Sequence, residues 1–134
     1  MPVEKNERVE IRASGDVVAV RQLVRARASE LGFSLVDQTK LVTAASELAR
    51  NTLDYGGGGS VQVECIIEPL RRGLRLTFED QGPGIPDLEQ ALRDGYTSGK
   101  GLGLGLGGTR RLMNEFDIQS RPGEGTRVRV ARWH

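Results

Sequence analysis

A glycine tract with a single cation, Gly99–Gly108 with Lys100, leads into a segment with helical character. Exposed backbone N–H groups where a loop enters a helix form an anion-binding site. The lysine adds a point charge suited to phosphate. The regular alternation of glycine and leucine is unusual for a plain flexible loop, which is the structural alternative. The tract therefore indicates an anion-binding loop that is suited to phosphate.

A carboxylate followed by two glycines, Asp80-Gln81-Gly82-Pro83-Gly84, comes directly after a segment that alternates like a strand. A carboxylate in this position could accept a hydrogen bond from a ligand amine, while glycine lets the backbone approach the ligand closely. The alternative is a turn that only ends the strand. Taken alone, the segment favours the turn, and a wall of a ligand pocket is the functional alternative.

A third pair of polar residues, Glu47 and Asn51, lies on a helical pattern of apolar residues. Residues i and i+4 share one face of a helix, one turn apart. Because that face adjoins the apolar stripe, the pair could line a cleft. The same spacing is common on solvated helices, so the pair alone indicates little.

Two simpler phosphate-binding motifs do not fit. The stretch Gly95–Lys100 has three residues between its glycines where a P-loop has four, and Gly101 stands where that motif has serine or threonine. Gly103–Gly108 matches G-x-G-x-x-G, but no strand precedes it and too little chain follows for a dinucleotide-binding fold. A dinucleotide oxidoreductase is therefore disfavoured.

The composition excludes several classes of function. The 134 residues carry a formal net charge of +1, with one cysteine, Cys65, and one histidine, His134 at the last position. An internal disulfide, an internal catalytic or phosphoacceptor histidine and a zinc site of histidines and cysteines are excluded. With no apolar run of membrane-spanning length and no secretory signal, we expect a cytoplasmic protein without nucleic-acid or membrane partners.

Apolar periodicity predicts the elements that position these segments. Helices are expected from Gly15 to a C-terminal cap at Gly32 and from a Ser34 cap to about Asp54. The other expected elements are strands 8–13, 61–67, 74–78, 116–120 and 126–132, a short helix 87–93, a loop 94–104 and a helix 108–115. This order predicts an α+β two-layer sandwich, with a mixed, mostly antiparallel sheet and helices on one face.

Taken in order, the three segments resemble the ATP-binding boxes of the GHKL superfamily, which share the Bergerat, or histidine-kinase-like, ATPase fold. The resemblance runs from about residue 8 to Trp133, which is nearly the whole chain, and implies one domain, residues 1–134. Within the superfamily the chain is similar to the small serine/threonine switch kinases that regulate bacterial anti-sigma pathways. The stretches Ser46–Asn51, Glu79–Asp87 and Arg111–Phe116 carry that similarity.

The resemblance implies ATP and Mg²⁺ as cofactors and gives roles to the residues. It implies that Asn51 coordinates the Mg²⁺ ion and that Glu47 acts as general base or orients the substrate hydroxyl. Asp80 would accept from the adenine amino group, with Gly82 and Gly84 letting the backbone pass close to the base. The other implied nucleotide-binding residues are Ile85, Lys100, Gly101, Leu102, Gly103, Leu104, Gly105 and Thr126.

The same resemblance implies a function. It is that of an ATP-dependent protein serine/threonine kinase acting as a stress-response switch, with STAS-domain antagonist and scaffold proteins of a stressosome as substrates. After release it would activate a PP2C-type phosphatase. The alternative is an anti-sigma factor or a nucleotide-binding switch module with negligible kinase activity.

Overall fold

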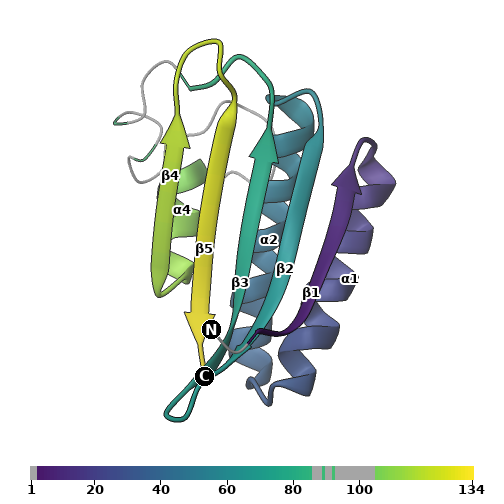
Figure 1. Cartoon of the computed structure of the whole chain (residues 1–134). Coiled ribbons are helices and arrows are strands. Elements are labelled where there is room, and N and C mark those ends of the chain that lie inside the picture. Colours follow the sequence, from purple (N-terminus) through teal and green to yellow (C-terminus); the bar gives the residue numbers. More distant parts are fainter. Residues whose placement is uncertain (1–2, 86–88, 90–91, 93–104) are drawn as a thin grey trace.

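The sheet has five strands and carries its helices on one face (Figure 1). A computed structural model describes residues 3–85, 89, 92 and 105–134 of the chain. The strand order is β1-β2-β3-β5-β4, and every described pair is antiparallel. This confirms the predicted α+β sandwich. The elements are β1 Val3–Ile11, α1 Ser14–Glu30, α2 Leu35–Asp54, β2 Gly59–Ile67, β3 Arg72–Asp80, α4 Gly105–Leu112, β4 Glu115–Ser120 and β5 Thr126–Trp133.

Helices α1 and α2 form where the apolar periodicity predicts them. The Ser34 hydroxyl caps α2 by accepting from the backbone N–H of Asp37 at 3.1 Å. Gly32, in the connection between the helices, has φ of +86°, as its predicted capping role requires. The residues of the two predicted stripes are buried: Val17, Val20, Val24, Ala28, Leu31, Leu41, Ala45, Leu48 and Thr52.

The hairpin of β2 and β3 covers this helical layer with the predicted alternation. Val61 pairs with Phe78 and Val63 with Leu76, and all four side chains are buried against the helices. The same register pairs Gly59 with Asp80. Asp80 therefore lies at the end of the sheet where α2 finishes, which brings the second and third polar segments of the sequence to one end of the molecule.

The first strand is longer than predicted and begins at Val3 instead of residue 8. Its early part is charged, so it carries no apolar alternation. It is held by ion pairs to α1: an Arg27 guanidinium nitrogen lies 3.0 Å from a Glu7 carboxylate oxygen, and Lys5 Nζ lies 3.1 Å from Glu30. Ala13, predicted at the end of the strand, is the N-cap of α1.

Helix α4 begins at Gly105, three residues before the predicted start, and ends at Leu112. Two of its side chains, Leu106 and Thr109, are buried, and the helix packs against α2. This burial outweighs the low helix propensity of its glycines. After the helix, the Asn114 N–H donates to the carbonyl of Ala131, which starts β4 and prevents the predicted continuation to residue 115.

The short helix predicted at 87–93 and the loop predicted at 94–104 lie outside the described residues, apart from residues 89 and 92. Among the helices that the structure does describe, none has both the length and the apolar content needed to cross a bilayer.

Candidate functional site

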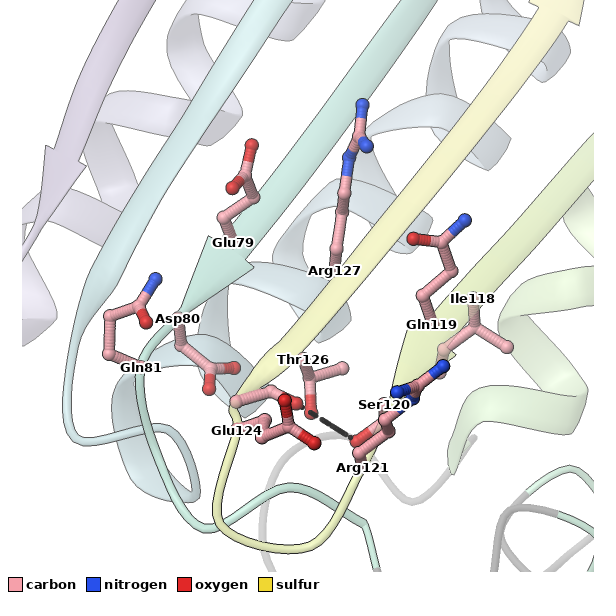
Figure 2. A pocket seen from close by; sticks show the side chains of 11 residues that line it. Glu79, Asp80, Gln81, Ile118, Gln119, Ser120, Arg121, Glu124, Thr126 and Arg127 are labelled. Atoms are coloured by element: carbon pink, nitrogen blue, oxygen red, sulfur yellow. Dashed lines mark hydrogen bonds between the residues drawn. The ribbon is translucent and has the colours of Figure 1, made fainter.

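A pocket of about 610 Å³ lies at the end of the sheet, between the end of β3 and the hairpin of β4 and β5 (Figure 2). The ends of β3 and β4, the start of β5 and the turns after β3 and β4 all contribute to it. Its described lining residues are Glu79, Asp80, Gln81, Ile118, Gln119, Ser120, Arg121, Glu124, Gly125, Thr126 and Arg127. The pocket therefore includes two of the residues predicted to hold the base, Asp80 and Thr126.

Asp80 is the last residue of β3 and pairs with Thr126, the first residue of β5. Its Oδ1 accepts from the N–H of Gly82 at 2.9 Å. Burial raises the pKa of the Asp80 carboxyl, and the backbone N–H groups of Gly82 and Thr126 lower that pKa in part. The half-buried carboxylate has acceptor capacity beyond these two bonds, so it can receive a ligand amine.

The glycines around Asp80 are explained by close contacts within the protein. A Cβ on Gly56 would lie 2.4 Å from Cγ of Asp80, and one on Gly82 would lie 2.7 Å from the Cα of Gly56. Gly84 has φ of +78°, and its Cβ would lie 2.2 Å from the carbonyl oxygen of Arg121. These contacts join the end of α2, the end of β3 and the β4–β5 turn.

We predict that Gly82→Ala destabilises the protein. The new Cβ would meet the backbone of Gly56, which cannot move away as a flexible side chain would, so we expect a loss of about 1–3 kcal/mol in the free energy of unfolding. Chemical denaturation measures it. The matched control is Gly15→Ala in the first turn of α1, where a Cβ meets nothing within 4 Å. Equal stabilities of the two variants would contradict the prediction.

Ser120 joins the turn after β3 to the β4–β5 hairpin. Its Oγ accepts from the N–H of Ile85 at 2.8 Å, lies 3.2 Å from the carbonyl oxygen of Gly125 and lies 2.8 Å from the hydroxyl of Thr126. The last of these bonds is drawn in Figure 2. A further bond, from the N–H of Gly123 to the carbonyl of Pro83 at 2.7 Å, ties the same two turns together.

Glu47 and Asn51 lie on α2, one turn apart, as predicted. The Glu47 side chain is 1% exposed and takes part in interactions within the protein, while Asn51 is half-buried. Neither lines the pocket of Figure 2. They are linked to it through the chain, because the carbonyl of Asn51 accepts from the N–H of Gly56 at 3.2 Å, and Gly56 lies against Asp80.

The predicted phosphate loop is described only at its end. Gly105, with φ of +65°, is the first residue of α4. The predictions for Lys100, Gly101, Leu102, Gly103 and Leu104 fall outside the described residues. Within the described ranges, no group of three or more acidic, histidine or cysteine side chains could hold a metal ion.

Sequence reasoning missed two residues of this region. Gly56 follows the predicted end of the second helix and was given no role, yet it lies against Asp80 and Gly82. Ser120 was expected only as the end of a strand, yet it makes three polar contacts. The available signals were the glycine run 56–59 and the position of Ser120 just before the turn that contains Pro122 and Gly123. Neither signal predicts which residue Gly56 or Ser120 will contact.

Comparison with known proteins agrees with this geometry. The family "Histidine kinase-, DNA gyrase B-, and HSP90-like ATPase" matches residues 36–133. The serine/threonine-protein kinase RsbT of Bacillus subtilis is 47% identical over 93% of this chain and 94% of its own. The anti-sigma F factor of Clostridium novyi is 32% identical over 81% of this chain and 79% of its own.

Two solved structures share the fold. The RsbU and RsbW domains of Rv1364c from Mycobacterium tuberculosis match with a TM-score of 0.66 at 18% identity, over 96% of this chain and 32% of that longer chain. The mycobacterial sensor histidine kinase MprB matches with a TM-score of 0.56 at 22% identity, over 96% and 97%. The family match and the near full-length likeness to RsbT extend over both α2 and the end of β3. The chain therefore belongs to the histidine kinase-, DNA gyrase B- and HSP90-like ATPase family and, within it, to the protein serine/threonine kinases.

Proposed function

We propose that this kinase is a regulatory switch that phosphorylates serine or threonine in STAS-domain antagonist and scaffold proteins of a stressosome-like complex. On release from that complex it would bind and activate a PP2C-type phosphatase. The observation that supports this most is the 47% identity to RsbT over 93% of the chain. The single domain, residues 1–134, would then act in the cytoplasm as a signalling component that answers stress.

The proposed reaction transfers the γ-phosphoryl group of ATP to a hydroxyl oxygen of the partner protein. An oxygen–phosphorus bond forms to the acceptor, the bond to ADP breaks, and Glu47 takes the hydroxyl proton. Such transfer depends on positioning and charge neutralisation, and a carboxylate near the acceptor assists because a neutral hydroxyl is a poor nucleophile. Glu47 is almost fully buried on α2, which restricts the rotamers of its side chain.

The residues present fit a magnesium ion held mainly by the nucleotide. Asn51 offers a half-buried amide oxygen on α2, and Mg²⁺ prefers oxygen ligands and retains several waters. Because the described residues contain no acidic cluster for a metal, phosphate oxygens and waters would supply the other ligands. When bound, the ion would neutralise charge that develops on the phosphates.

The adenine would lie at the end of β3. Asp80 would accept from its amino group and Thr126 would support that contact, while Gly82, Gly84 and Ile85 would form the adjacent wall. At the phosphate end, Lys100 would pair with the phosphates and the loop residues from Gly101 to Gly105 would wrap them. The support for these phosphate-binding roles comes from the sequence and from family membership.

The direct test incubates the full chain with γ-labelled ATP, Mg²⁺ and the STAS-domain protein encoded nearest its gene. We expect label on a serine or threonine of that protein, and stimulation of the PP2C-type phosphatase when the free kinase is added. Absence of both signals, with the kinase folded and ATP bound, would contradict the proposal.

We predict that Asn51→Ala lowers the rate of this transfer by about a hundredfold or more, because the variant lacks the proposed side-chain ligand to the metal. The assay follows label on the STAS-domain protein at several Mg²⁺ concentrations. The matched control is Asn6→Ala, which removes an exposed amide on β1 that accepts from Gln62 at 2.8 Å. Unchanged transfer by Asn51→Ala would remove Asn51 from the metal site.

A second candidate function is sequestration of a sigma factor. It is favoured by the likeness to anti-sigma F factors, at 29% identity over 84% of the chain for the protein of Thermoanaerobacter sp. and 32% over 81% for that of Clostridium novyi. Stable co-purification with a sigma factor, together with no transfer to any STAS-domain protein, would favour this candidate over the kinase switch.

A further inference from the structure

The Ser120 hydroxyl has one proton to donate, and the three contacts that it makes determine where that proton goes. The carbonyl of Gly125 can only accept, and the N–H of Ile85 can only donate. Ser120 Oγ therefore donates to the Gly125 carbonyl at 3.2 Å and accepts from Ile85 at 2.8 Å. All three contacts are hydrogen bonds at the same time only when the Thr126 hydroxyl is the donor in the third, 2.8 Å to Ser120 Oγ.

This direction determines what Thr126 can offer to a ligand. Because its proton points at Ser120, its oxygen has only lone pairs left for other partners. Thr126 pairs with Asp80 in the sheet, and both residues line the pocket in Figure 2. An ionised Asp80 is also only an acceptor. The two side chains together therefore present acceptors and no donor.

We propose that Ser120 is a positioning residue for base selection: it holds the Thr126 hydroxyl as an acceptor, so that the pocket favours a purine with a 6-amino group over one with a 6-oxo group. The proposal rests on the proposed function, because it takes the purine of ATP to lie beside Asp80 and Thr126. Asp80 alone discriminates less, since a carboxylate can also accept from the N1–H of a 6-oxo purine. A second fixed acceptor disfavours the 6-oxo oxygen, which itself can only accept.

The test compares dissociation constants for ATP and ITP, which differ in the 6-amino and 6-oxo groups, by calorimetry on the full chain. Wild type should bind ATP more tightly. In Ser120→Ala the Thr126 hydroxyl is free to turn and donate, so the preference for ATP should fall by about tenfold, the usual size of one gained or lost hydrogen bond to a ligand. Ser120→Thr, which keeps the hydroxyl, should retain the wild-type preference.

Two further variants separate a change in base selection from a general loss of stability or of nucleotide binding. Ser34→Ala removes the cap of α2 at the other end of that helix and lowers stability without touching the pocket, so it should leave the ATP:ITP ratio unchanged. In a Thr126→Val background, adding Ser120→Ala should not change the ratio, because no hydroxyl remains to reorient.

The outcomes distinguish failure of the proposed function from failure of the role given to Ser120. If wild type binds neither nucleotide, the proposed function fails. If wild type binds and prefers ATP but Ser120→Ala keeps the full preference, or lowers it equally with and without the Thr126 hydroxyl, the role of Ser120 is overturned while the proposed function stands.

Discussion

Replacing Glu47 with glutamine should abolish most of the phosphoryl transfer while ATP still binds. General-base assistance contributes about 10²–10⁴ to a rate, so we expect a loss of this size in kcat with the Kd for ATP changed by no more than about twofold. Glutamine keeps the volume of the buried side chain, which is 1% exposed, but cannot take a proton. Transfer is measured with labelled ATP and the STAS-domain substrate, and binding by calorimetry.

The matched control for this change is Glu64→Gln. Glu64 is also nearly buried, at 9% exposed, but it lies on the sheet and accepts from the guanidinium of Arg75 at 2.9 and 3.2 Å. Losing that pair should cost stability and leave transfer per folded molecule unchanged. If Glu47→Gln loses ATP affinity in parallel with activity, the residue holds the nucleotide or its pocket, and the general-base role is wrong.

The sequence predicted the parts of the fold whose residues show regular burial. The stripe Leu41, Ala45, Leu48 and Thr52 on α2 and the alternation in β2 and β3 are local patterns, and each follows from one face being removed from water. Once the hairpin of β2 and β3 forms, its register places Asp80 beside the end of α2. That part of the candidate site was therefore within reach of sequence reasoning.

The remainder depends on contacts between distant parts of the chain. Nothing around Ser120 indicates that its hydroxyl will meet Ile85, 35 positions earlier. The first residues of β1 carry charges whose partners lie on α1, so no apolar pattern marks that part of the strand. The glycines at the start of α4 favour a loop by propensity, and burial of Leu106 against the core overrides it.

Replacing Asp80 with asparagine should separate nucleotide binding from folding. A hydrogen bond to a charged acceptor contributes about 1.5–3 kcal/mol, so the Kd for ATP should rise by roughly ten- to a hundredfold. In wild type the Asp80 Oδ1 accepts from the Gly82 N–H at 2.9 Å, and the asparagine Oδ1 can still accept this bond. The apo protein should therefore stay folded, and a given concentration of ATP should raise its Tm by less than we expect for wild type.

The direction of the Asp80 pKa shift predicts two further results. Burial raises this pKa in the folded protein, so the native state binds more protons than the unfolded chain between the two pKa values, and ionisation above them costs stability. Apo Asp80→Asn should thus be at least as stable as wild type at neutral pH.

Because a ligand amine favours the ionised carboxylate, ATP affinity of wild type should fall as the pH drops through this raised pKa. The Asp80→Asn protein should lack that step. Protonation of ATP itself affects binding to both proteins equally. The difference between their two pH profiles of ATP affinity therefore isolates the contribution of Asp80. A parallel pH dependence in the two proteins, or a large loss of apo stability with unchanged ATP affinity, would place the adenine amine away from Asp80.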